Sequence, residues 1–231
     1  MSVSPIAAMF DRISQKYDTL NHLLSLNIDK AWRRKTAIAV AKCQPKTILD
    51  LATGTADLAI VMAKHNPQAH IVGMDISDRM LEIGKTKITG QRLERQIELR
   101  HGDAVALPLP DGSFDTVTAA FGVRNFEDLN QGLAEISRVC RSGGCLCILE
   151  LTMPEKFPLR QLYRIYFKHL LPSIGKIVSK DRSAYAYLPT SVERFPKPAA
   201  FAGLLASHDL YNIAAKRLTC GIATLFTATK L

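Results

Sequence analysis

The stretch 47–57 reads T-I-L-D-L-A-T-G-T-A-D, which predicts a β-strand, a tight turn and the start of a helix in direct succession. Residues 48–51 form an apolar β-type run, residues 52–56 are small, and apolar residues recur at helical spacing from 58 to 63. A glycine in such a turn, Gly54, allows a ligand to approach the backbone, and the N–H groups of the helix start face the same place. The stretch therefore indicates a ligand-binding turn, with a purely structural strand-to-helix turn as the alternative.

Two acidic residues follow this turn at the ends of further strand-like runs. Asp75 closes the run 70–75, and Asp103 follows the run 97–100. A carboxylate at the end of the second strand of a βαβ unit can accept hydrogen bonds from both hydroxyls of a ribose. The turn has the single glycine Gly54 where dinucleotide-binding turns have three, so the close backbone approach of a pyrophosphate is not expected. A nucleoside without phosphate, such as S-adenosylmethionine (SAM), fits better than NAD.

The composition indicates a folded protein with one large α/β domain. The chain has 231 residues, of which 47% are apolar, and no apolar stretch reaches the roughly 18 residues of a membrane-spanning helix. The N-terminus lacks the basic start and apolar block of a secretory signal. Five cysteines are scattered without the spacing of a disulfide framework. The spacing of Cys140, Cys145 and Cys147 does not suit zinc and no histidine is near them, so we expect no metal and a reducing cytosol.

The charge of the chain is unevenly distributed over four segments. The net charge of +9 comprises +5 in residues 1–46, −5 in 47–155, +7 in 156–197 and +2 in 198–231. The simplest explanation of the two basic segments is that they form ordinary solvated surfaces. More specific explanations are that they bind an anionic membrane surface or a nucleic acid. An apolar stripe accompanies the basic segments and no aromatic platform for RNA is evident, so we favour a membrane surface and expect no nucleic acid.

The same segments give the expected organisation. Strand-like and helix-like runs alternate in 47–155, which predicts a parallel sheet with helices on both faces and a ligand at the carboxyl ends of the strands. Residues 1–46 read as a helical arm or lid, 156–197 as a helical cap, and 198–231 as a helix and an antiparallel strand hairpin. Within the cap we expect one helix over 157–171, followed by a connection rich in helix breakers.

Blocks along nearly the whole chain carry a resemblance to a known family. The turn 52–56, Asp75 and the pair Gly143-Gly144 resemble class I SAM-dependent methyltransferases. A closer resemblance, to the ubiquinone/menaquinone biosynthesis C-methyltransferases, rests on these blocks in order: Y-D-x-x-N-x-x-x-S-L at 17–26, W-R-R at 32–34, A-L-P-x-P-D-x-S-F-D at 106–115, A-F-G-V-R-N at 120–125, L-L-P-x-I-G at 170–175, Y-x-Y-L at 185–188, R-F-P at 194–196 and L-T-x-G at 218–221. The resemblance implies a Rossmann-like fold with a mostly parallel, seven-stranded sheet, an antiparallel C-terminal strand, a helical arm and an inserted cap.

The resemblance also implies an activity, which is methyl transfer from SAM to a ring carbon of a polyprenyl quinol. Demethylmenaquinol is the first choice of acceptor, and 2-methoxy-6-polyprenylbenzoquinol is the alternative. The implied setting is the inner face of the cell membrane, where the protein is cytoplasmic and docks transiently through its basic arm and cap. A homodimer or an assembly with other quinone-synthesis proteins would be compatible with this setting.

Matching positions supply the site residues. The implied cofactor-binding set is Asp50, Gly54, Thr55, Asp75, Asp103, Ala104 and Ala120. Arg124, Asn125 and Tyr17 would face the quinol, with Arg124 stabilising a phenolate and a water held by the three as proton acceptor. The chain has alanine at 56 and 120, where the family usually has glycine and serine, which leaves open weaker SAM binding or even loss of activity.

Other interpretations remain open from the sequence. The chain could be a class I methyltransferase for a soluble small molecule, a non-catalytic SAM-binding scaffold, or a nucleic-acid methyltransferase, although it lacks an N-P-P-Y-type motif. Arg124 could instead pair with Glu127 at the surface, and Tyr17 could serve packing alone. Trp32 reads as a core anchor, and Glu150, at a strand end, could touch the substrate.

Overall fold

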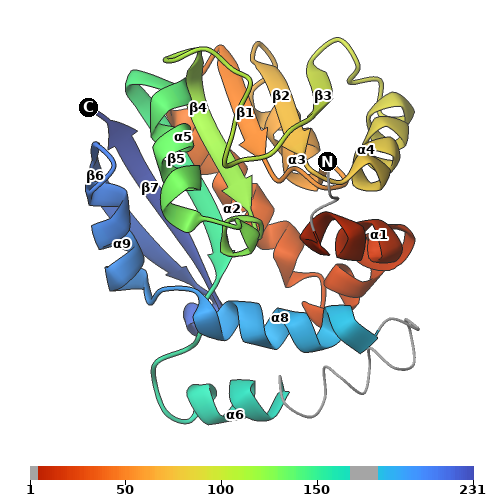
Figure 1. The fold of residues 1–231 in the computed structure, drawn as a ribbon, viewed down its shortest axis with the longest axis vertical. Helices are drawn as coiled ribbons and strands as arrows, with labels where there is room; N and C mark the ends of the chain where they lie inside the picture. The colour runs from red at the N-terminus through yellow and green to blue at the C-terminus, as the bar shows by residue number, and fades with distance from the viewer. Residues whose placement is uncertain (1–4, 167–181) are drawn as a thin grey trace.

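The computed structural model describes residues 5–166 and 182–231 (Figure 1). Its centre is a seven-stranded sheet with the order β3-β2-β1-β4-β5-β7-β6. The pairs among β1 to β5 are parallel, and β7 is antiparallel to both β5 and β6. The strands are β1 (Thr47–Leu51), β2 (His70–Asp75), β3 (Ile97–His101), β4 (Phe114–Ala120), β5 (Cys140–Leu151), β6 (Leu210–Leu218) and β7 (Ala223–Lys230). The expected mostly parallel sheet with an antiparallel C-terminal strand is confirmed.

Helices cover both faces of this sheet. The helices are α1 (Pro5–Leu24), α2 (Ile28–Lys42), α3 (Asp57–His65), α4 (Asp78–Gly90), α5 (Leu129–Val139), α6 (Leu159–Ile165), α8 (Arg182–Arg194) and α9 (Pro198–Ala206), with short 3-10 turns η1 (Val123–Asn125) and η3 (Thr219–Gly221). Ile48 of β1 packs with residues of α2 and α3, whereas its neighbour Leu49 packs with residues of α5 and α9. Successive strand residues point to opposite faces, so the apolar run of β1 is buried on both sides.

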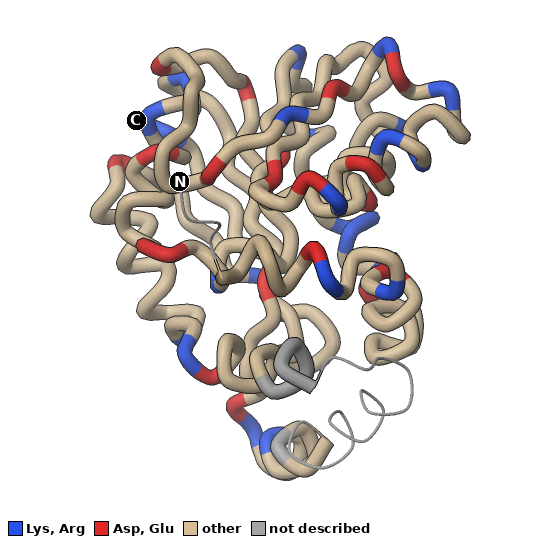
Figure 2. Tube along the Cα trace, turned by 45° about the vertical axis from the view of Figure 1, so that its right-hand side comes forward, with Lys and Arg blue, Asp and Glu red and all other residues tan. Residues whose placement is uncertain are grey.

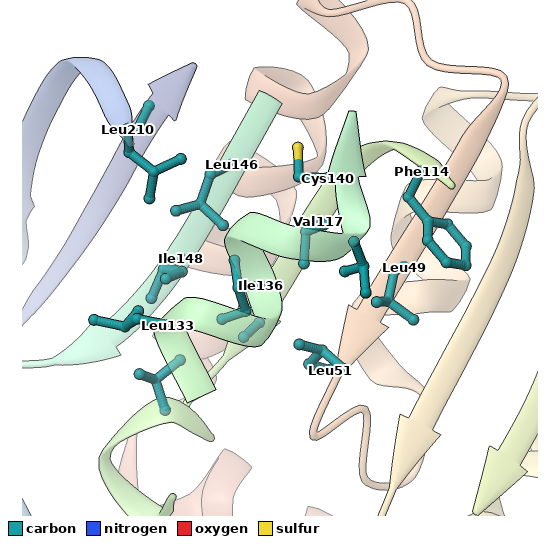
Figure 3. Packing of buried hydrophobic residues seen from close by; sticks show 14 of the residues in the cluster. Leu49, Leu51, Phe114, Val117, Leu133, Ile136, Cys140, Leu146, Ile148 and Leu210 are labelled. Carbon is teal, nitrogen blue, oxygen red and sulfur yellow. The ribbon is translucent and has the colours of Figure 1, made fainter. Parts of the chain in front are cut away.

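The largest apolar cluster joins α5 to the centre of the sheet (Figure 3). Leu133 and Ile136 of α5 are fully buried with Val117 of β4 and Ile148 of β5. Burying a side chain of this size contributes roughly 1.5–3 kcal/mol. This packing fixes β1 and β4 as neighbours, so the turns that leave their carboxyl ends lie side by side.

Helix α1 of the arm and the helices of the cap lie beyond those carboxyl ends, whereas α2 packs on a face of the sheet. Figure 1 shows α1, α6 and α8 below the strand ends, on the side away from the C-terminus of the chain. A helix was expected over 157–171, and the structure has α6 over Leu159–Ile165, with residues 167–171 of that expectation lying outside the described residues. The prediction of an irregular connection after this helix was wrong for residues 182–194, because α8 occupies them and continues through Pro189. Burial of Ser191 and Val192 in α8 holds this turn of helix in place despite the proline. The division of the chain into arm, module, cap and C-terminal hairpin stays a prediction.

One pair of cysteines departs from the expected thiols. Cys43, at the end of α2, and Cys145, in β5, form a disulfide whose Cα atoms are 6.5 Å apart. The cysteine spacing gave no sign of it, because 102 residues separate the two positions. Cys140 and Cys147 are buried free thiols. The disulfide ties the arm to the centre of the sheet.

Candidate active site

The turn between β1 and α3 has an unusual backbone. Ala52, Gly54 and Ala56 all have positive φ angles, of 49°, 55° and 64°. The left-handed conformation costs an alanine roughly 1–2 kcal/mol, so the sheet and helix packing must hold the turn in this shape. A Cβ atom added at position 122 would lie 2.3 Å from the Cβ of Ala52, which explains the glycine there. The turn and the loop after β4 therefore approach each other as closely as their side chains allow.

Asp75 is fixed in the position that the sequence predicts for it. Its Oδ2 accepts a hydrogen bond of 2.8 Å from the N–H of Gly54, and its Oδ1 accepts one of 2.9 Å from the N–H of Ser77. Burial raises the pKa of Asp75 above its ordinary value, and the backbone N–H groups act in the opposite direction. The carboxylate thus joins the turn after β1 to the start of α4.

A cavity opens beside these residues at the carboxyl ends of the strands. Its lining includes Gly54, Asp75, Asp103, Ala104, Ala120 and Asn125. A smaller cavity adjoins it, lined in part by Asp50 and Thr55. The two cavities have Tyr17, Ala52, Gly54 and Ala120 in common. The structure therefore brings all seven residues of the expected cofactor set to one continuous place, which from here on is called the cofactor cavity.

Asp50 lies under this cavity and is almost completely buried. Its carboxylate accepts hydrogen bonds of 2.7 Å from the hydroxyls of Thr53 and Thr118. Burial raises the pKa of Asp50 to about 6, and the two hydroxyls limit the rise. The hydroxyls of Thr53 and Thr118 thus hold the Asp50 carboxylate in place under the cavity.

Thr55 connects the turn to the arm. Its hydroxyl donates a hydrogen bond of 2.6 Å to Asp18 of α1. The Nζ of Lys87 lies 3.0 Å from the other oxygen of Asp18 and also pairs with Asp57. Because these bonds join α1 to α3 and α4, helix α1 covers one side of the cofactor cavity.

A second cavity, of about 250 Å³, lies between the arm and the cap. Its lining is mostly apolar and aromatic, and comes from α1, α2, α6, α8 and the loop after β4: Leu24, Leu26, Trp32, Phe121, Tyr163 and Leu188 among others. Tyr17 and Phe121 line both this cavity and the cofactor cavity. The second cavity is called the acceptor cavity below, because its position next to the cofactor cavity suits the second reactant of a transfer reaction.

Arg124 stands in the wall of the acceptor cavity and is held by several bonds. Its Nη1 lies 2.6 Å from Oε1 of Glu150 and also donates to the carbonyl oxygen of Phe121, and its Nε donates to Ser191 of α8. Arg124 and Glu150 have side chains only 6% and 0% exposed. Burial, the largest single influence, acts to lower the pKa of Arg124, but the charge and hydrogen bond of Glu150 together with Tyr17 and Tyr187 outweigh it and the pKa is raised. The surface pairing with Glu127 is therefore replaced by a buried pair with Glu150.

Tyr17 and Asn125 are the other two residues expected to face the quinol. Burial raises the pKa of Tyr17 above its ordinary value, although Arg124 and Arg33 act against the rise. Tyr17 is therefore a neutral hydrogen-bond donor at neutral pH and not a base. Asn125 lines the cofactor cavity, and its Oδ1 accepts a hydrogen bond of 3.0 Å from the hydroxyl of Tyr187.

Two buried charged residues of this region were missed from the sequence. Glu150 was considered only as a substrate contact, and its position at the end of a strand next to the Arg124 loop was the available signal. Arg33, in the W-R-R block, was given no role, yet it lines both cavities. Trp32 is buried as expected, and its Nε1 donates a hydrogen bond of 2.8 Å to Thr219.

The described residues offer neither a metal-binding cluster nor a membrane-spanning helix. Within 5–166 and 182–231 no group of three or more His, Cys, Asp or Glu could hold a metal ion. Over the same part of the chain, no helix is both long and apolar enough to cross a membrane.

The sequence of this chain is similar to that of known proteins over almost its whole length. The model of the ubiE/COQ5 methyltransferase family matches residues 2–230. A demethylmenaquinone methyltransferase of Bacteroides fragilis is 43% identical over 225 residues, covering 97% of this chain and 92% of the relative. A ubiquinone/menaquinone biosynthesis C-methyltransferase UbiE of Geobacter sulfurreducens is 40% identical, with coverage of 97% and 88%.

The fold has solved counterparts as well. The human N-acetylserotonin methyltransferase in complex with SAM superposes with a TM-score of 0.67 at 19% identity, covering all of this chain and 60% of the other. A likeness at this identity concerns the fold alone, whereas the family match covers the sequence of almost the whole chain. The chain is therefore a SAM-dependent methyltransferase that belongs to the ubiE/COQ5 methyltransferase family.

Proposed function

We propose that this enzyme transfers the methyl group of SAM to a ring carbon of a polyprenyl quinol, with a demethylnaphthoquinol such as demethylmenaquinol as acceptor. The observation that carries the proposal is the apolar acceptor cavity, which adjoins the cofactor cavity at Tyr17 and Phe121. The relatives named demethylmenaquinone methyltransferase support the choice of ring. An apolar, aromatic cavity suits a quinol ring with the first part of its prenyl tail.

The cofactor cavity has the chemistry that SAM requires. Asp75 would accept hydrogen bonds from the ribose hydroxyls, since it already stands at the strand end with its orientation fixed by two N–H groups. Asp103 and Ala104 would lie beside the base, and Asp50, Thr55, Gly54 and Ala120 beside the rest of the molecule. SAM supplies a methyl group that is already strongly electrophilic, so the protein has to position the acceptor and make its ring carbon nucleophilic.

Arg124 is the residue that we propose for the second task. A phenol has a pKa of about 10, so at neutral pH the acceptor hydroxyl needs help to ionise. A fixed guanidinium beside the forming oxyanion supplies that help without being deprotonated itself. The bonds of Arg124 to described residues use Nη1 and Nε, which leaves Nη2 as the donor for the acceptor.

The proton of the hydroxyl then needs a destination. Tyr17 is excluded as that base because its raised pKa keeps it protonated. We propose a water held by Arg124, Asn125 and Tyr17, with the amide of Asn125 oriented by Tyr187. Tyr17 would donate to the quinol or to this water.

The acceptor is a lipid, and we propose that the protein docks on the inner face of the cell membrane to reach it. Two large apolar side chains are exposed in this region: Leu26, which lines the acceptor cavity, and Leu162, next to the lining residue Tyr163, with exposed fractions of 77% and 57%. They belong to the α1–α2 turn and to α6, which meet where the hydroxyl of Tyr166 donates to the carbonyl of Leu24. Figure 2 shows positive and negative residues mixed along most of the chain. We propose that the exposed apolar side chains add to the attraction that the net positive charge of the arm and cap exerts on anionic lipid.

The test is methyl transfer from labelled SAM to two detergent-solubilised acceptors, a demethylmenaquinol and a methoxy-polyprenylbenzoquinol, both kept reduced. Transfer to the naphthoquinol is expected, and an Arg124→Met variant should lose most of kcat while it still binds SAM. Transfer to the benzoquinol alone would refute the proposed ring, and the name of the Geobacter relative is the reason to include it. No transfer to either acceptor, with SAM binding intact by calorimetry, would favour a non-catalytic SAM-binding scaffold.

A further inference from the structure

We propose that Arg33 of the arm binds the carboxylate at the amino-acid end of SAM, so that the cofactor site is complete only when α2 is in place. The inference deepens the SAM site and rests on SAM being the cofactor, but it does not depend on which acceptor is methylated. None of the seven residues assigned to the cofactor from the sequence carries a positive charge.

The two parts of the cofactor cavity suggest how the cofactor would lie. The larger part contains Asp75 and Asp103, which suit the ribose and base of a nucleoside. The smaller part continues from it past Gly54 and Ala120 and is lined by the turn after β1. An adenosine placed on Asp75 therefore directs its amino-acid end into the smaller part, which is where Arg33 stands.

The charges around the cavity make Arg33 the one available partner for a carboxylate. The acidic residues in the lining of the two parts are Asp50, Asp57, Asp75, Asp103 and Glu127. These suit the sulfonium and ammonium groups of SAM and would repel its carboxylate. Among the described residues that line either part, Arg33 is the only one with a cationic side chain.

Arg33 is held in place with donors to spare. Its side chain is 8% exposed, and Nη1 pairs with Asp29 one turn earlier in α2. Its Nη2 lies 3.9 Å from Asp57, beyond hydrogen-bond distance, and the guanidinium carbon lies 5.2 Å from the centre of the Phe121 ring. A guanidinium has five N–H donors, so a planar carboxylate can still bind to the free edge.

Lys87 is the nearest competing cation. Its ammonium group contacts Thr55 at 3.1 Å, but it is already paired with both Asp18 and Asp57. It does not line either part of the cavity. Lys87 therefore supports the acidic residues near the turn, whereas Arg33 faces the space itself.

The test compares two ligands that differ by the carboxylate alone. Binding of S-adenosylhomocysteine and of its decarboxylated amine analogue is measured by calorimetry, without acceptor, for the wild type and for Arg33→Met. A charge-assisted pair is expected to make the variant bind S-adenosylhomocysteine about 10- to 100-fold more weakly. The amine should bind both proteins within about two-fold, and the exposed neighbour Arg34→Met should change neither ligand.

A second variant guards against a folding defect, because Arg33→Met leaves the buried Asp29 without its partner. The double variant Asp29→Asn/Arg33→Gln removes both charges and should show the same selective loss. Equal weakening of both ligands in the variants would mean a structural role and overturn the proposal. Unchanged binding of S-adenosylhomocysteine would overturn it too, and since no acceptor is present neither result bears on the proposed quinol.

Discussion

Replacing Asp50 with asparagine should remove a pH dependence from the stability of this enzyme. Asp50 is buried under the cofactor cavity, and its pKa of about 6 is above the 3.8 of an unperturbed aspartate. The folded protein therefore holds this proton more tightly than the unfolded chain does. The stabilisation that the bound proton provides is complete below pH 4 and is lost as the pH rises to about 6.

The size of the effect follows from the two pKa values. A rise of about two pKa units corresponds to about 3 kcal/mol at 25 °C, since one unit is about 1.4 kcal/mol. Asparagine is neutral throughout, so Asp50→Asn does not experience this loss. The free energy of unfolding of the wild type, minus that of the variant, should fall by about 2–3 kcal/mol between pH 4 and pH 7. Other groups that titrate in this range affect both proteins and cancel in the difference.

Urea unfolding of the protein without cofactor, repeated at intervals from pH 4 to pH 7.5, measures this difference. Thr118→Val is a useful companion, because the Thr118 hydroxyl lowers the pKa of Asp50 and its loss should move the decline to higher pH. If the wild type and Asp50→Asn kept a constant difference over the whole range, Asp50 would not be the titrating group. A difference that grew with pH would show that the sign is wrong.

Three further predictions follow from other contacts. Glu150→Gln leaves the buried Arg124 without its counter-charge and should lower the free energy of unfolding, measured by chemical denaturation, by about 3 kcal/mol. A decrease of less than about 1 kcal/mol would mean that water reaches the pair. Cys43→Ser removes a disulfide that closes a long loop and should lower the free energy of unfolding by roughly 2–4 kcal/mol. A reductant should lower the thermal unfolding midpoint of the wild type but not that of the variant. Gly144→Ala would place a Cβ atom within 2.9 Å of two backbone oxygens, so the midpoint should drop by several degrees, and an unchanged midpoint would contradict the tight packing there.

The parts of this structure that were predictable from sequence are those with a local cause. The strand, turn and helix at 47–65 follow from apolar periods and small residues within a few positions. Asp75 could be placed because parallel strands end at one edge of the sheet, so two consecutive strand ends are neighbours without any further information. The alanine at position 56 has a φ of 64°, which gives a physical reason for a glycine there in related sequences.

The parts that were not predictable depend on contacts between distant segments. The partner of Arg124 is Glu150, 26 residues away, and no pattern within either segment distinguishes it from the nearer Glu127. The partner of Thr55 is Asp18, on a helix whose position over the sheet is set by packing. Pro189 inside α8 misled the prediction in another way. A proline normally ends a helix, but burial of the turn that follows it keeps α8 continuous here.

The polar contacts of α1 hold this helix against the segments that line the cofactor cavity. Ser77 donates a hydrogen bond of 2.6 Å to Asp11 of α1, and Thr55 donates one of 2.6 Å to Asp18 of the same helix. Both donors belong to the segments that hold Asp75 and Gly54, and Tyr17 of α1 lines both cavities. Each hydrogen bond contributes about 1 kcal/mol net, so the two together favour the position of α1 that the structure shows. In that position the helix places Tyr17 at the boundary between the cofactor cavity and the acceptor cavity.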